Sequence, residues 1–189
     1  SLFAFFCVPA YFLSILWLSL PNWVFILAVF VAVVQTYAWF NFVYLLKRAK
    51  IKILEVNNTF LKNFIIFIAF AISLKFILQL ASTFPALSQI SFGFRPIVIA
   101  YLHLVLLAFV SLFLLYFIVV NRLVNFTKKM KIGIIIFIFG VILNEVLLTI
   151  QGVSSFSFTQ IPNINEMLFI ASVLLFFGMA YCSLQLIKK

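Results

Sequence analysis

Three ionisable side chains stand inside long apolar runs of the sequence, where a charged group is costly. They are Lys75, His103 and Glu145. A charge at the centre of a lipid bilayer costs about 2.5 to 3.5 kcal/mol on the scale from insertion experiments, so such residues usually pair or line a polar site. Lys and Glu can neutralise each other, and His can exchange a proton near neutral pH. These residue types therefore predict an interhelical ion pair or a protonatable binding site.

The three residues also share a depth. Each lies six or seven residues from one end of its predicted helix, which at 1.5 Å per residue is roughly 10 Å. The helices concerned are predicted over residues 60–82, 96–120 and 132–151. If those ends lie at one membrane surface, the three groups lie at one level, and Lys75 and Glu145 are expected to be coupled.

Polar neighbours extend the predicted site on the helix that carries Lys75. Gln79 follows at i+4 and Ser82 at i+7, which places all three on one face of an otherwise apolar helix. Arg95 precedes the helix of His103 and stands at its outer mouth, where it could reach toward an anion.

Small and polar residues align on the helix of Glu145. Four of them follow one another at spacings of seven, four and seven residues, which predicts that they form one narrow wedge: Gly133, Gly140, Asn144 and Gln151. Glu145 lies beside this wedge. Glycines let a second helix approach closely, and amides can hydrogen-bond across the contact. The binding residues predicted from the whole pattern are Lys75, Gln79, Arg95, His103, Asn144 and Glu145.

Catalytic sets of the familiar kinds are missing from the sequence. It contains no aspartate and one histidine, so no Ser-His-Asp triad can be assembled, and it has neither a Walker motif nor an HExxH motif. Haem ligation by His103 would need a second ligand from another chain or from missing sequence. No catalytic residue or metal site is predicted, the cofactor stays unknown, and an enzymatic role is not favoured.

The elements that position these residues are apolar helices. Of the 189 residues 67% are hydrophobic and 8% are charged, far outside the range of soluble domains. The fold class predicted is all-α, a polytopic transmembrane bundle that forms a single domain over 1–189. Its six helices are expected at about 2–20, 23–46, 60–82, 96–120, 132–151 and 166–187. Because the chain enters the first run at once after Ser1, which is not Met, we expect a fragment of a longer membrane protein with helices upstream.

Positive charge is distributed very unevenly over the predicted loops. One side holds eleven Lys and Arg residues, in the two basic loops, at Lys62 and at the C-terminal Lys188 and Lys189, and the other side holds Arg95 alone. The positive-inside rule then puts the basic loops and the C-terminus in the cytoplasm. Anionic lipid headgroups at the cytoplasmic face explain the net charge of +10, so no nucleic-acid partner is expected. A membrane-protein partner or missing N-terminal helices would complete the assembly.

One segment resembles a known group of proteins. Residues 92–104, which read Phe-Gly-Phe-Arg-Pro-Ile-Val-Ile-Ala-Tyr-Leu-His-Leu, are similar to uncharacterised multi-pass bacterial inner-membrane proteins that are distantly like the large subunit of haem–copper oxidases. The resemblance implies a helix that opens with Arg-Pro and carries a His in the outer half of the bacterial inner membrane. The resemblance does not imply that this chain binds the cofactors of those oxidases, because they hold haem and copper with several histidines and this sequence has one.

Four functions remain open on these observations, and the fourth and weakest is a membrane enzyme that acts on a lipid-linked substrate. The first is an outer-leaflet polar site that binds or transports a small molecule, an ion or a proton. The second is a respiratory or redox subunit that binds haem or a quinone through His103. The third is a structural or assembly subunit whose polar residues serve helix packing alone.

Overall fold

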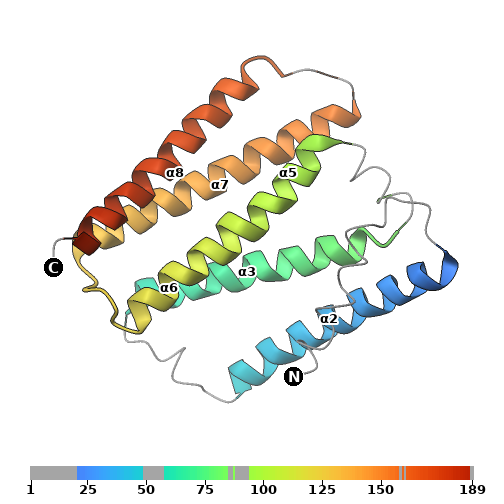
Figure 1. Ribbon diagram of the computed structural model, residues 1–189, viewed down its shortest axis with the longest axis horizontal. Coiled ribbons are helices and arrows are strands. Elements are labelled where there is room, and N and C mark those ends of the chain that lie inside the picture. The colour runs from blue at the N-terminus through green and yellow to red at the C-terminus, as the bar shows by residue number, and fades with distance from the viewer. Residues whose placement is uncertain are drawn as a thin grey trace. The chain divides into compact units, whose positions relative to one another are not determined.

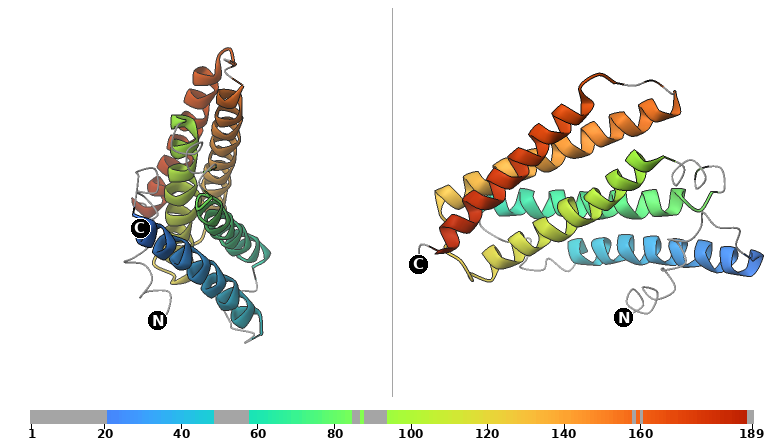
Figure 2. Two further views of the ribbon diagram at one scale, coloured as in Figure 1. Left: turned by 90° about the vertical axis from the view of Figure 1, so that its right-hand side faces the viewer. Right: turned by 45° about the horizontal axis from the view of Figure 1, so that its top comes forward.

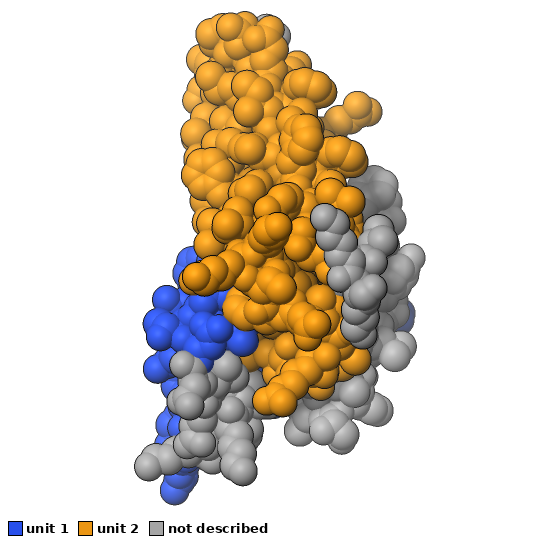
Figure 3. All heavy atoms as spheres, turned by 90° about the vertical axis from the view of Figure 1, so that its left-hand side faces the viewer, with its two compact units in different colours: residues 1–93 blue, residues 94–189 orange. Residues whose placement is uncertain are grey.

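The computed structural model describes residues 21–48, 58–84, 87, 94–157, 159 and 161–187. Within these ranges the regular structure is helical, as expected (Figure 1). The helix predicted over 2–20 and both lysines at the C-terminus lie outside the described residues. The chain divides into two compact units, Ser1–Gly93 and Phe94–Lys189, which Figure 3 colours separately. That both belong to one bundle stays a prediction.

Five helical stretches in the described residues are long and apolar enough to cross a membrane. Their mean hydropathy lies between 2.0 and 2.7, and their lengths run from 22 to 28 residues. A hydrocarbon core of about 30 Å needs about 20 helical residues, so each stretch suffices. Large aromatic side chains such as Phe70 and Phe176 are exposed by 63% and 68%, a pattern suited to lipid contact. These features fit a multi-pass membrane protein, and the sixth predicted span is the one not described.

The first unit contains an antiparallel pair of helices. Helix α2 spans Asn22–Arg48 and α3 spans Thr59–Ala81, and they lie side by side (Figures 1 and 2). Asn58 caps α3 by accepting a hydrogen bond from the backbone N–H of Phe60 at 3.0 Å. The indole Nε1 of Trp39 donates to Oγ of Ser73 at 2.9 Å and ties the two helices together.

The second unit begins with one long helix that changes its winding midway. It runs as α5 (Arg95–His103), the π-helix η2 (Leu104–Ser111) and α6 (Leu112–Val120). Pro96 stands in its first turn, as predicted, where a missing N–H breaks no hydrogen bond. A π-helix inside an α-helix is rare and occurs frequently at functional sites. This one begins at the residue after His103.

Helices α7 (Lys128–Phe156) and α8 (Ile164–Ile187) complete the second unit and lie antiparallel along each other (Figure 1). Helix α7 is longer at both ends than the predicted 132–151. Thr127 accepts a hydrogen bond from the N–H of Met130 at 3.2 Å, and this cap begins the helix within the basic segment that the charge pattern assigned to a loop. At the other end, the hydroxyls of Ser154 and Ser155 both donate to the carbonyl of Gln151, within the helix.

Glycines set the close approach of α7 and α8. A Cβ on Gly178 would lie 2.7 Å from the backbone N of Phe137, and one on Gly133 would lie 2.7 Å from Sγ of Cys182. Leu147, Ile164 and Ala171 form a buried apolar cluster farther along the same contact. The close helix packing predicted from glycine is therefore confirmed, with α8 as the partner helix.

Candidate functional site

Polar side chains gather at two places in the membrane-spanning helices, one in each unit. In the first unit Lys75 donates from Nζ to Oε1 of Gln79, one helical turn away. The hydroxyl of Ser82 donates to the backbone carbonyl of Gln79 at 2.8 Å. The predicted polar stripe on this helix is thus confirmed as a chain of contacts.

Gln35 of α2 completes this first group, although it was not among the predicted binding residues. Its Oε1 accepts a hydrogen bond from Nε2 of Gln79 at 2.9 Å, and both side chains are buried. A lone Gln in an apolar run was the available signal. Helical periodicity gives the face of a single glutamine and not its partner, so the bond to Gln79 could not be predicted from the sequence.

The second group joins α5 to α7. The amide Nδ2 of Asn144 lies 2.9 Å from Nδ1 of His103, and Asn144 is buried. When the amide nitrogen donates, Nδ1 accepts and the ring proton of a neutral imidazole sits on Nε2. A protonated ring would need the amide turned so that Oδ1 accepts. Asn144 can therefore bond both states of His103 by rotating its amide group.

Glu145 stands next to Asn144 and differs from the other predicted residues in one respect. Its Oε1 atom is buried, and among the described residues it has no hydrogen-bond partner. A buried carboxylate oxygen without a partner is costly when ionised, because water is excluded and no donor replaces it. A proton, a bound cation or a hydrogen-bond donor would satisfy this atom.

The predicted common depth of Lys75, His103 and Glu145 stays a prediction, although His103 and the helix of Glu145 contact each other. His103 lies eight residues from the start of α5, about 12 Å along its axis, and its contact with Asn144 places the two helices level there. Because α7 continues to Phe156, Glu145 lies about 16 Å from the end of its own helix and not about 10 Å. Extra turns of helix beyond the contact account for the difference.

The predicted wedge on α7 is wrong as a single surface. Gly133 and Gly140 face α8, where Cβ atoms on them would approach Cys182 and Leu175, whereas Asn144 faces α5. The residues align on a helical wheel, but two different helices cover successive parts of that face. Small residues serve the α8 contact and the amide serves the α5 contact.

The six predicted residues thus fall into different surroundings. Lys75 and Gln79 contact each other in the first unit, and His103 and Asn144 contact each other in the second. Arg95 is exposed in the first turn of α5. Because Lys75 and Glu145 belong to different units, their coupling stays a prediction.

Metal-binding residues do not cluster in the part of the chain that the structure describes. No group of three or more His, Cys, Asp or Glu side chains is placed there to hold an ion. Buried Cys182 packs against α7, with its Sγ 4.0 Å from the carbonyl of Met130. This thiol is a packing group in the helix contact.

Comparisons with protein-family models, with curated proteins and with solved structures found no match to this chain. The five candidate spans among the described residues fit a multi-pass helical membrane protein. The resemblance of residues 92–104 to inner-membrane proteins stays an expectation.

Proposed function

We propose that this chain is an integral membrane protein that binds a proton in the outer half of a bacterial inner membrane. Glu145 and His103 are the protonatable groups, and Asn144 bonds the histidine in either state. The observation that carries the proposal is the buried, unpartnered Oε1 of Glu145 beside the contact between Asn144 and His103. A carboxyl group so placed is stabilised by taking up a proton.

The orientation belongs to the same proposal. Basic loops in the cytoplasm place the start of α5 and the end of α7 at the outer surface. Arg95 then stands at the outer mouth, and Lys75 with Gln79 forms a second polar group on α3. We place access to the site on the outer side, because Asn144 and Gln79, two of the buried polar residues, belong to the predicted outer half.

Counting protons tests the proposal on the purified full-length chain. An unbuffered sample is titrated from about pH 8 to about pH 5, the range in which His changes its charge, and the protons taken up are compared between variants. Glu145→Gln keeps the shape of the side chain and is expected to take up about one proton fewer than the unmodified chain over this range. Glu166→Gln is the matched control, because it removes a carboxylate that is exposed in the first turn of α8, outside the proposed site. Identical curves for Glu145→Gln and the unmodified chain would refute proton binding at Glu145.

A structural role is the second candidate, and a separate observation favours it. Lys75, Gln79 and Gln35 bond to one another, and His103 bonds to Asn144, so these groups can act entirely as interhelical contacts. Under this reading Glu145 pairs with Lys75 and takes up no proton in the titrated range.

A further inference from the structure

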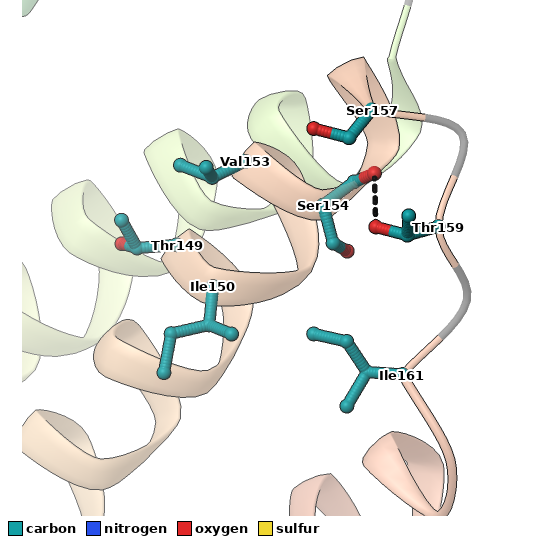
Figure 4. Close-up of a pocket in the computed structure, with 7 residues that line it drawn as sticks. All are labelled: Thr149, Ile150, Val153, Ser154, Ser157, Thr159 and Ile161. Carbon is teal, nitrogen blue, oxygen red and sulfur yellow. Dashed lines mark hydrogen bonds between the residues drawn. The ribbon is translucent and has the colours of Figure 1, made fainter.

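A depression lies in the second unit where α7 ends and the chain turns toward α8. Its volume is about 440 Å³, within the range of small-molecule sites. Four hydroxyl-bearing and three aliphatic residues line it, and Ile150 and Ile161 stand on opposite sides (Figure 4). The residues of the proton site are not part of its lining.

Hydroxyl protons in this depression are directed into the backbone. Thr149 donates to the carbonyl of Glu145 at 2.7 Å and Ser154 donates to the carbonyl of Gln151 at 2.9 Å. Thr159 donates to the carbonyl of Ser154 at 3.4 Å, the bond drawn in Figure 4. A hydroxyl has one proton and two acceptor lone pairs. With the protons committed, these side chains offer oxygen lone pairs, so the surface selects a ligand that donates hydrogen bonds.

The position along the helices indicates where such a ligand resides. The candidate spans in this unit end at Ser155 and begin again at Ile164, and the depression lies at that boundary. Headgroups of lipids occupy this level when the spans cross a bilayer. The aliphatic residues Ile150 and Val153 continue the lining toward the hydrocarbon. A lipid headgroup fits the hydroxyl-bearing part of the lining, and its glycerol region fits the aliphatic part.

The lining of the depression contains no basic side chain that could bind an anion. The sequence has no Lys or Arg between Lys131 and Lys188, and Glu166 places a carboxylate in the first turn of α8. Arg95 begins α5, but that helix packs through Ile97 on Gly152, which is outside the lining. An anionic headgroup therefore finds no basic side chain in the depression.

We propose that the depression binds the primary ammonium headgroup of a phospholipid, with its N–H groups donating to the hydroxyl oxygens of Ser154 and Thr159, which stand together in Figure 4. The proposal needs the two spans to cross a membrane and does not depend on proton binding at Glu145. The ligand class is phosphatidylethanolamine, which has three N–H donors. Phosphatidylcholine has the same phosphate and acyl chains but no N–H group, so it is the natural comparison.

Native mass spectrometry of the detergent-solubilised full chain tests this proposal. Phosphatidylethanolamine, phosphatidylcholine and phosphatidylglycerol with identical acyl chains are titrated, and the dissociation constant of the first bound lipid is measured. We expect phosphatidylethanolamine to bind about tenfold more tightly than phosphatidylcholine, the scale of two hydrogen bonds. Combining Ser154→Ala with Thr159→Val should remove that preference and leave binding of phosphatidylcholine unchanged.

Ser172→Ala is the matched control variant. Ser172 is exposed on α8 and donates to its own helix, at the carbonyl of Phe169, but lies outside the depression. This variant should keep the full preference for phosphatidylethanolamine. Equal binding of the ethanolamine and choline lipids would overturn the proposal. Tightest binding of phosphatidylglycerol would also overturn it, because the donors would then be hydroxyls on an anionic lipid.

Discussion

At the scale of single residues, the contact between His103 and Asn144 is the clearest link between function and structure. The sequence predicted both residues as members of a site, because polar groups are rare in apolar helices. It did not predict that they would bond each other, since helical periodicity gives the face of a residue and not its partner. The 2.9 Å contact joins α5 to α7 at the beginning of the π-helix.

A double-mutant cycle measures what this contact contributes. Replacing His103 by Leu and Asn144 by Leu, singly and together, should give a coupling energy of about 0.6 to 1.7 kcal/mol in unfolding experiments in detergent, the range for hydrogen bonds between membrane helices. His103 and Ser172 do not contact each other, so the changes in the free energy of unfolding from His103→Leu and Ser172→Ala should add within about 0.5 kcal/mol. Additivity for the first pair as well would mean that the bond does not stabilise the unit.

At the scale of elements, the existence of the helices was predictable and their ends were less so. Apolar runs longer than 18 residues identified each described span. The ends of α7 were missed because Lys128, Lys129 and the serines after Gln151 were taken for loop residues, although Thr127 offered a cap. The π-helix was not predictable, because no Pro or Gly interrupts residues 104–111.

Glycine substitutions test the packing of α7 against α8. Gly178→Ala would put a Cβ 2.7 to 2.9 Å from the atoms of Phe137, including its backbone, which cannot move without shifting the helix. We expect a loss of about 1 to 3 kcal/mol in the free energy of unfolding. Gly152→Ala would meet the movable Cγ1 of Ile97 at 3.0 Å, and the higher helix propensity of Ala should offset most of that strain. Equal losses in the two variants would contradict the contact seen in the structure.

At the scale of the whole molecule, orientation in the membrane is the property on which the outer-leaflet site depends. It rests on the uneven distribution of Lys and Arg over the loops, which sequence alone supplies. The pairing of Lys75 with Glu145 also belongs to this scale, because the two residues come from different units. Residue spacing could suggest that pairing but could not decide it.

Cysteine labelling of intact cells tests the orientation. In a background with Cys7→Ser and Cys182→Ala, Asn125→Cys and Ser157→Cys place single exposed thiols beyond the two ends of α7. A maleimide that does not cross membranes should label the cysteine at 157 and not the one at 125, and permeabilised cells should label both. Labelling at 125 alone would reverse the orientation and move the proposed site to the cytoplasmic half.

The protonation state of Glu145 tests the central claim most directly. Infrared difference spectra between about pH 8 and about pH 5 detect the carbonyl stretch of a carboxylic acid that takes up a proton in this range. We predict a carboxylic acid band that is absent from Glu145→Gln and present in Lys75→Met. If Glu145 is instead ionised throughout and its band appears only after Lys75→Met, the carboxylate is held in an ion pair with Lys75, and the proton site that we propose does not exist.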